Sequence, residues 1–322
     1  MKKRGLSLLL AIIMVATVFS PAFPFLGIFA SAADTGASGE TSGVEADAYA
    51  TVITASDFQD GRSGNAYEEA FGTMLEKAKA DGILEPDGFI LGGDYESSAP
   101  GDHDTPTAYR RVESVITNAF PYYNKNNIVN IQGNHDENDP SVIDQTGPYE
   151  YEDYIVYVIN NTDYPAGTGG TAAKNKTQQT SDNLAAYFNM LKAEGETRPI
   201  FIATHIPLHH NSRNPKANNK DAEGNILSTG WNETLYSRIL FDTINENAKT
   251  FDIIFLFGHN HSGVYDDYIG GSVNYIGKGQ KIRIPDYNVT PSETSYTEET
   301  LNFTYMNYGY VGYSNNENNN TL

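Results

Sequence analysis

Short apolar segments that alternate with amphipathic ones are the feature of this sequence that most restricts its fold. Five apolar segments have the length of buried β-strands, namely residues 50–55, 88–91, 128–132, 200–204 and 253–257. Helical patterns occupy the residues between and beside them, namely 66–80, 107–119, 181–194 and 233–248. In the first of these, Phe71, Met74, Leu75 and Ala78 fall on one helical face. Strands that alternate with helices in this way predict an α/β fold.

Three further stretches have weaker patterns. Residues 154–159 form the strand-like centre of the stretch 147–180, and a loop rich in Gly, Thr and Asn is expected after them. A second polar loop is expected over residues 206–231. Beyond His261, alternation over residues 272–276 and 302–308 predicts antiparallel strands.

Polar side chains follow every one of the five apolar segments. The sets are Asp57-Phe58-Gln59, Gly93-Asp94, Gly133-Asn134-His135-Asp136, Thr204-His205 and Gly258-His259-Asn260-His261. They contain four of the seven histidines of the chain. In open α/β sheets ligands bind at the carboxyl ends of the strands, so these sets are expected to meet at one site. Residues two apart in an extended chain point to the same side, which pairs Asp57 with Gln59 and His259 with His261.

Composition narrows the chemistry of such a site. The chain contains no cysteine, which excludes disulfides, thiolate metal ligands and a cysteine nucleophile. Its formal net charge of −20 repels phosphate backbones, so a nucleic-acid polymer is not expected as the substrate. The chemistry therefore has to use oxygen and nitrogen groups on a small or phosphorylated substrate.

The first residues follow the order of a secretory signal peptide. Basic residues at positions 2–4 precede an apolar run and a small-residue stretch, which predicts a signal peptide over residues 1–32 with cleavage after Ala32. An uncleaved membrane anchor is the alternative, although Pro21 and Pro24 interrupt the apolar run. After removal of this segment no transmembrane span is expected, and the protein is expected to be secreted or located at the cell surface.

The remaining organisation is read from composition. Residues 33–48 predict a flexible linker, residues 49–314 the folded domain, and residues 315–322 a disordered Asn-rich tail that could mark a truncation point.

The motifs resemble those of the calcineurin-like metallophosphoesterases from Asp57 to His261. This resemblance implies an α/β fold in which a two-sheet β-sandwich is flanked by helices, with two metal ions at the strand ends. It implies that the first ion is bound by Asp57, Gln59, Asp94 and His261. It implies that the second ion is bound by Asp94, as a bridging ligand, together with Asn134, His205 and His259. The catalytic residue His135 would stand outside the metal shell, beside the leaving group.

The donor types agree with this assignment. Carboxylate, imidazole and amide oxygen suit Mn, Fe or Zn, and two such ions can activate a bridging hydroxide and neutralise phosphoryl oxygens. The expected activity is that of a hydrolase acting on phosphate mono- or diesters, either a phosphatase or a phosphodiesterase.

Two positions depart from the family pattern. The first motif of the family normally ends in histidine, where this chain has Gln59. An amide oxygen is a harder donor than imidazole, so this site shifts toward Mn, Mg or Ca, and Gln59 binds its ion either directly or through water. Some relatives orient the catalytic histidine with an aspartate at the position of Ser97. The partner of His135 is therefore left open among Glu96, His103 and Asp136.

Residues after the third and fourth apolar segments could contact substrate. Asn134, His209 and Arg213 are the candidates, and the alternative for the last two is a solvated polar loop. Two functions follow from the whole pattern, a secreted dinuclear-metal phosphoesterase or a non-catalytic surface-binding domain that keeps the fold. Retention of seven of the eight expected site residue types favours the enzyme.

Overall fold

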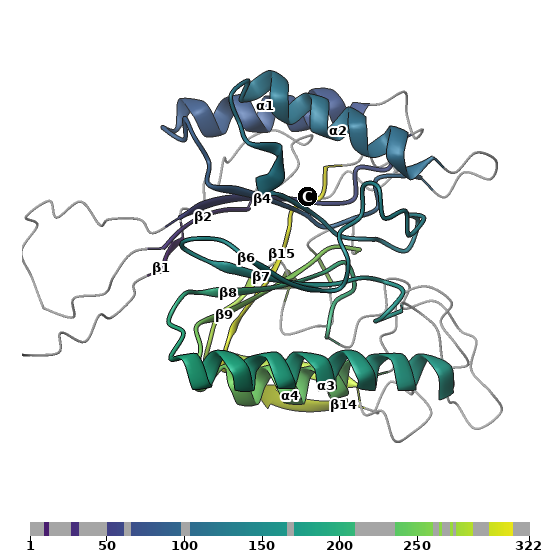
Figure 1. Cartoon of the computed structure of the whole chain (residues 1–322), viewed down its shortest axis with the longest axis vertical. Helices are drawn as coiled ribbons and strands as arrows, with labels where there is room; N and C mark the ends of the chain where they lie inside the picture. Colours follow the sequence, from purple (N-terminus) through teal and green to yellow (C-terminus); the bar gives the residue numbers. More distant parts are fainter. Residues whose placement is uncertain are drawn as a thin grey trace, which may run out of the picture.

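The computed structural model describes residues 10–12, 27–31, 50–60, 66–97, 104–165, 171–209, 236–259, 264–265, 271–272, 275–285 and 296–311. Two sheets are packed face to face, and a pair of helices covers the outer face of each sheet (Figure 1). This is the four-layer α/β/β/α arrangement that the motifs implied, and the α/β prediction is confirmed.

The first sheet has the strand order β1-β2-β3-β4-β5. Its strands are β1 (Leu10–Ile12), β2 (Gly27–Ser31), β3 (Thr51–Ala55), β4 (Gly88–Leu91) and β5 (Ile128–Asn130). Strands β3, β4 and β5 run parallel, whereas β1 and β2 pair antiparallel at the edge. Because the three parallel strands are joined through α1 (Ala66–Ala80) and α2 (Thr105–Ala119), their carboxyl ends lie at one edge of the sheet.

The second sheet has the strand order β12-β15-β9-β8-β7-β6. Its strands are β6 (Gly147–Glu150), β7 (Ile155–Ile159), β8 (Ile200–Thr204), β9 (Ile253–Phe257), β12 (Tyr275–Ile276) and β15 (Thr304–Asn307). The helices α3 (Thr171–Glu194) and α4 (Ser237–Asn247) cover it. The smaller elements are β10 (Val264–Tyr265), β11 (Gly271–Ser272), β13 (Lys281–Pro285), β14 (Tyr296–Thr300) and the 3-10 helix η2 (Lys125–Asn127).

Alternation along the strands divides the apolar residues among three cores. Val52, Ile90 and Leu256 belong to the core between the two sheets. Their neighbours Ile53 and Phe89 face the helices of the first sheet. The third core lies between the second sheet and α3 and α4. Burial on both faces explains why these strands read as continuous apolar runs in the sequence.

The five predicted apolar strands are confirmed, and one loop prediction is wrong. The loop expected up to Thr180 contains the first ten residues of α3, which begins at Thr171. Its inner face there is small and polar, and Thr177 Oγ1 donates to the carbonyl of Ala173 at 3.0 Å. Such a face gives no apolar periodicity. The antiparallel strands expected over residues 272–276 and 302–308 are confirmed by the pairing of β12 with β15, and β15 also pairs parallel with β9, which was not predicted.

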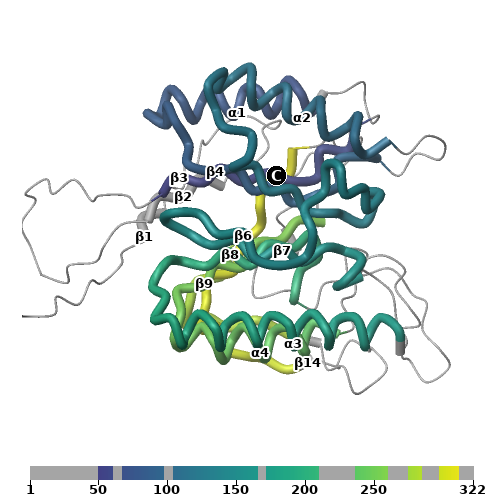
Figure 2. The backbone as a smooth tube through the Cα atoms, in the orientation of Figure 1, coloured from purple at the N-terminus to yellow at the C-terminus, as the bar shows by residue number. Residues whose placement is uncertain are grey.

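The last strand continues from the second sheet toward the first. Figure 2 shows this yellow C-terminal segment rising between the layers. The amide of Ser56, at the end of β3, donates to the carbonyl of Gly309 at 2.9 Å, and the amide of Val311 donates back to Ser56 at 3.1 Å. The carboxyl ends of both sheets are thereby joined at the level of the predicted site.

Strands β1 and β2 fall inside the predicted signal peptide, and cleavage after Ala32 stays a prediction. The linker at 33–48 and the tail at 315–322 lie outside the described residues. In the part of the chain that the structure describes, no helix combines the length and the apolar character needed to cross a bilayer.

Candidate metal centre

Four residues at the strand ends have left-handed backbone conformations. Among the described non-glycine residues, positive φ angles occur at Asp57 (58°), Gln59 (53°), Asp94 (54°) and His259 (69°). This conformation costs an L-residue roughly 1–2 kcal/mol, and such strain gathers at functional sites. All four are residues that the sequence predicts as metal ligands. The strained turns direct their side chains to the common edge of the two sheets.

Glycine is required beside these turns because the strand ends approach one another closely. A Cβ atom on Gly133 would lie 2.2 Å from Asp94 Oδ1. A Cβ atom on Gly258 would lie 2.9 Å from Asp57 Oδ2 and 3.1 Å from His205 Nδ1. These glycines therefore leave room for the carboxylates and the imidazole of the site.

The predicted ligands of the second ion lie together. One ligand atom from each of Asp94, His205 and His259 lies within 4.8 Å of the others, and all three residues are buried. His205 Nε2 lies 3.3 Å from Asp94 Oδ1 and 3.1 Å from Asn134 Oδ1. The same oxygen of Asn134 lies 2.7 Å from His259 Nδ1. The structure therefore brings together all four residues of this predicted set.

The tautomer of His205 is fixed by its other ring nitrogen. Nδ1 lies 2.7 Å from the carbonyl oxygen of Gly92, which can only accept, so Nδ1 carries hydrogen. Nε2 then faces the oxygens of Asp94 and Asn134. Because an unprotonated Nε2 and both oxygens are acceptors, a proton or a cation has to lie between them. Burial by itself lowers the pKa of His205. The carboxylates of Asp94 and Asp57 and the hydrogen bond to Gly92 outweigh burial and raise the pKa to about 9.

This donor set fits a divalent metal ion. A backbone carbonyl that holds one imidazole nitrogen and leaves the other toward an ion is a common arrangement around metal-binding histidines. The combination of carboxylate, imidazole and amide oxygen matches Mn, Fe or Zn. Asp94 contacts both predicted sets, with its carboxylate near His205 and its backbone carbonyl bonded to the backbone amide of Gln59.

The predicted ligands of the first ion lie beside Asp94. Asp57 Oδ2 accepts from Ser56 Oγ at 2.5 Å and from the amide of His259 at 3.2 Å, and Asp57 Oδ1 lies 4.0 Å from His205 Nε2. The side chain of Gln59 is buried, and its backbone amide donates to the backbone carbonyl of Asp94 at 2.9 Å. The fourth predicted ligand, His261, lies outside the described residues.

His135 lies next to the bridging carboxylate. Its backbone amide donates to Asp94 Oδ1 at 3.0 Å, and its ring Nε2 lies 3.8 Å from Asp94 Oδ2. The side chain is 18% exposed, whereas that of Asp94 is fully buried. His135 therefore lies at the margin of the cluster, where a group can meet both the buried site and a bound substrate.

The candidate partners of His135 have other bonds. The carboxylate of Asp136 accepts from backbone amides, including those of Asp94 and Gly133. Burial and the charge of Asp94 raise the pKa of Asp136 to about 7, while bonds from backbone amides lower it. Glu96 accepts from the hydroxyl of Thr105 and from the amide of Asp104. The third candidate, His103, lies outside the described residues.

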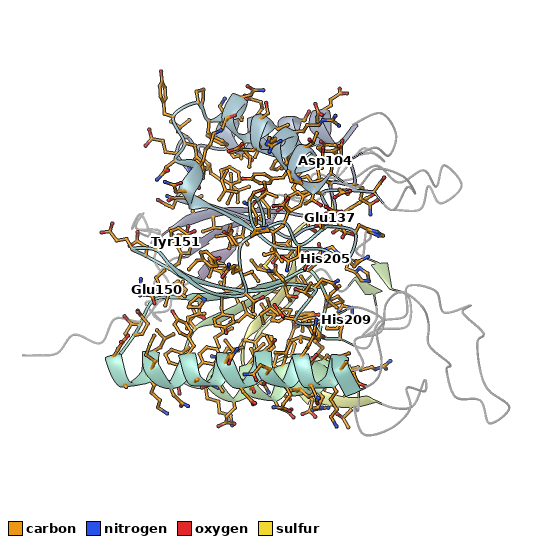
Figure 3. All side chains as sticks on the ribbon, turned by 45° about the vertical axis from the view of Figure 1, so that its right-hand side comes forward. Asp104, Glu137, Glu150, Tyr151, His205 and His209 are labelled. Atoms are coloured by element: carbon orange, nitrogen blue, oxygen red, sulfur yellow. The ribbon has the colours of Figure 1, made fainter. Side chains whose placement is uncertain are left out.

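Of the two substrate contacts predicted after β8, the structure describes only His209. Figure 3 shows His205 between the sheets and His209 nearer the layer of α3. His209 is buried, its Nδ1 lies 2.6 Å from the hydroxyl of Tyr305, and its ring packs edge-on against Phe257. It is therefore not part of a solvated loop. Arg213 lies outside the described residues.

Sequence reasoning missed the groups that support these ligands. The carbonyl of Gly92 and the hydroxyl of Ser56 belong to residues with no motif of their own, although each directly precedes a predicted turn or ligand. Position next to a motif was the only signal available for them.

Comparison with protein families supports what the geometry indicates. The family model described as calcineurin-like phosphoesterase matches residues 50–263, which span every strand end that contributes to the cluster. Comparison with curated proteins gives no match. Since the family model covers well over half of the chain, the protein belongs to the calcineurin-like phosphoesterases.

Proposed function

We propose that the protein is a dinuclear-metal phosphoesterase that acts outside the cytoplasm on small phosphate mono- or diesters or on phosphorylated substrates. The observation that carries this proposal is the convergence of Asp94, His205 and His259 within 4.8 Å of one another at the joined edge of two sheets. Family membership supports phosphate ester hydrolysis as the reaction class.

The ions bound at such a site would supply an activated water nucleophile and positive charge for the phosphoryl oxygens. Asp94 would hold both ions, because its carboxylate lies 3.3 Å from His205 and its backbone carbonyl binds the backbone amide of Gln59, in the other predicted set. Asn134 directs its amide oxygen to both histidines of the second set and contributes a polar contact for the substrate.

His135 is the proposed general acid. Its ring is partly exposed and lies 3.8 Å from Asp94, so it can reach the oxygen of a departing alcohol from outside the ligand cluster. Proton donation by a positioned side chain contributes roughly 10²–10⁴-fold to such reactions. Arg213 is proposed to contact the substrate from the segment after β8, whereas His209 is buried against Tyr305 and Phe257 and is not proposed to do so.

The proposed location rests on residues 1–32, whose charged, apolar and small-residue order is that of a secretory signal. An acidic surface, with a net charge of −20, favours small phosphate esters over polymeric nucleic acid. Mn, Fe or Zn are the proposed ions, with Mg or Ca as alternatives at the site of Gln59.

A non-catalytic surface-binding domain is the second candidate, and the replacement of the usual histidine by Gln59 is what favours it. Metal content of the purified protein and initial rates on an aryl phosphate monoester and an aryl phosphate diester separate the two. Two ions per chain with turnover that is lost on chelation are expected for the enzyme. Ions without turnover on either ester would favour the binding domain.

A further inference from the structure

The carboxylate of Asp136 joins two of the strand ends that form the metal centre. Oδ2 accepts from the amides of Asp94 at 2.7 Å and Gly133 at 2.8 Å. Oδ1 accepts from the amides of Tyr95 at 2.8 Å and Glu96 at 3.2 Å. The residue is 8% exposed. One buried side chain thus binds backbone from both the loop after β4 and the loop after β5.

These bonds act on the backbone that sets the direction of a predicted ligand. Asp94 has a φ of 54°, an unfavourable conformation for a residue with a Cβ atom. The hydrogen bonds that the backbone amides of Asp94 and Tyr95 donate to Asp136 help to offset this cost.

The same loop is held from its other side by the end of β3. The backbone carbonyl of Asp94 accepts from the backbone amide of Gln59 at 2.9 Å. The backbone carbonyl of Tyr95 accepts from the backbone amide of Asp60 at 2.7 Å. In return, Asp94 Oδ1 accepts from the amide of His135 at 3.0 Å. Three strand ends, and with them the ligands of both predicted ions, are therefore linked through the backbone of the Asp94 loop.

We propose that Asp136 is a positioning residue of the reaction centre, which fixes the bridging carboxylate of Asp94 relative to Asn134 and His135. This inference rests on the proposed dinuclear function. Asp136 touches neither substrate nor ion in this role; it acts through the backbone it binds.

The test compares Asp136→Asn with Asp144→Asn. In Asp136→Asn a single amide oxygen remains to accept, and the new NH₂ group faces N–H donors. Asp144 is a matched control, because it is an acid after β5 that is partly buried and its Oδ2 accepts from the backbone amide of Asn130 at 2.7 Å. No bond of Asp144 to a predicted ligand is seen among the described residues.

Two measurements are made on each variant, with the melting temperature as a measure of general destabilisation. Hydrogen exchange of the metal-free proteins should show lost protection at Asp94, Tyr95 and Gly133 in Asp136→Asn, and only around Asn130 in Asp144→Asn. Titration with Mn and with Zn should show roughly 10–100-fold weaker binding for Asp136→Asn and unchanged binding for Asp144→Asn, the usual scale for groups that support metal ligands.

The positioning role would be contradicted if Asp136→Asn bound both ions with wild-type affinity and its melting temperature fell as much as that of Asp144→Asn. Asp136 would then have a purely structural role. Unchanged protection at the three amides would contradict the hydrogen bonds themselves. If the wild-type protein binds no divalent ion, the proposed function fails and the positioning role fails with it, while the exchange data still report on the hydrogen bonds.

Discussion

His135 binds Asp94 through its backbone and faces it with its ring. The amide of His135 donates to Oδ1 of Asp94 at 3.0 Å, and its ring Nε2 lies 3.8 Å from Oδ2 of the same carboxylate. The proposed acid and the proposed bridging ligand are thus held as a unit, yet they have separable tasks. Substitutions at the two positions should have different consequences for metal content.

Asp94→Asn should remove both ions and abolish activity, because one carboxylate has to neutralise and bridge two divalent cations. Elemental analysis of the purified variant gives the ion content. Asp81→Asn, which changes an exposed acid paired with Lys77 at 2.9 Å, is the control and should keep both ions. Two ions per chain in Asp94→Asn would contradict the bridging assignment.

His135→Ala should keep both ions and lose turnover on esters with poor leaving groups by roughly 10²–10⁴-fold, since such alcohols need a proton as they depart. Rates on a series of aryl esters with increasingly acidic phenols measure this dependence. The loss should shrink as the phenol becomes more acidic. An equal loss across the series would mean that His135 is not the acid.

Gln59→His should tighten the first site toward Zn or Fe, because imidazole suits these ions and a hard amide oxygen favours Mn, Mg and Ca. The second site shares only Asp94 with the first and should change little. Gln59→Leu removes the oxygen at similar size and should weaken the first site. Titration of the metal-free proteins with Zn and Mn compares the three. Unchanged affinity in both variants would show that Gln59 does not bind an ion.

Gly258→Ala should lower stability by about 1–3 kcal/mol and weaken metal binding, because its Cβ atom would lie 2.6 Å from Ser56 Oγ and close to Asp57. The control is Gly72→Ala in α1, where a Cβ atom has one neighbour, Val115 Cγ1, at 3.8 Å. That change should stabilise the helix by up to about 1 kcal/mol. Chemical denaturation should give a lower free energy of unfolding for Gly258→Ala and a higher one for Gly72→Ala. Metal titration should show weaker binding in Gly258→Ala.

Glu196 should contribute pH-dependent stability. Hydrogen bonds from the side chain of Arg198 lower the pKa of Glu196 to about 2, from an ordinary value of 4.5. The contribution is complete above pH 4.5 and is lost as the pH falls through about 2. Melting temperatures of the metal-free wild type and of Glu196→Gln should differ most near neutrality and converge toward pH 2. A difference that stays constant with pH would contradict this coupling.

The sequence was sufficient where local patterns decide the structure. Burial on both faces made β3, β4, β8 and β9 continuous apolar runs, and the carboxyl ends of parallel strands brought the following polar residues together. The meeting of these residues at one edge could therefore be predicted, whereas their division into two ligand sets came from the resemblance to the calcineurin-like metallophosphoesterases.

What could not be predicted depends on partners far along the chain. Asp136 looked like a possible partner for the ring of His135, but its carboxylate accepts from an amide 42 positions away in Asp94. The start of α3 was missed because its inner face carries polar residues. The hydroxyls of Thr177 and Thr180 donate to backbone carbonyls four residues earlier in the same helix, so these residues can be buried there. The parallel pairing of β15 with β9 was not predicted, because alternation does not specify which strands become neighbours.

The joint between Ser56 and residues 309–311 also bears on the order in which the protein matures. Asp57 is synthesised early, but the strand that fixes its neighbour follows all of the predicted metal ligands in the chain. Until then the second sheet lacks β15, which lies between β9 and β12. A nascent chain that has not reached residue 311 therefore lacks this joint, and stable metal retention is expected only after that segment has joined the fold.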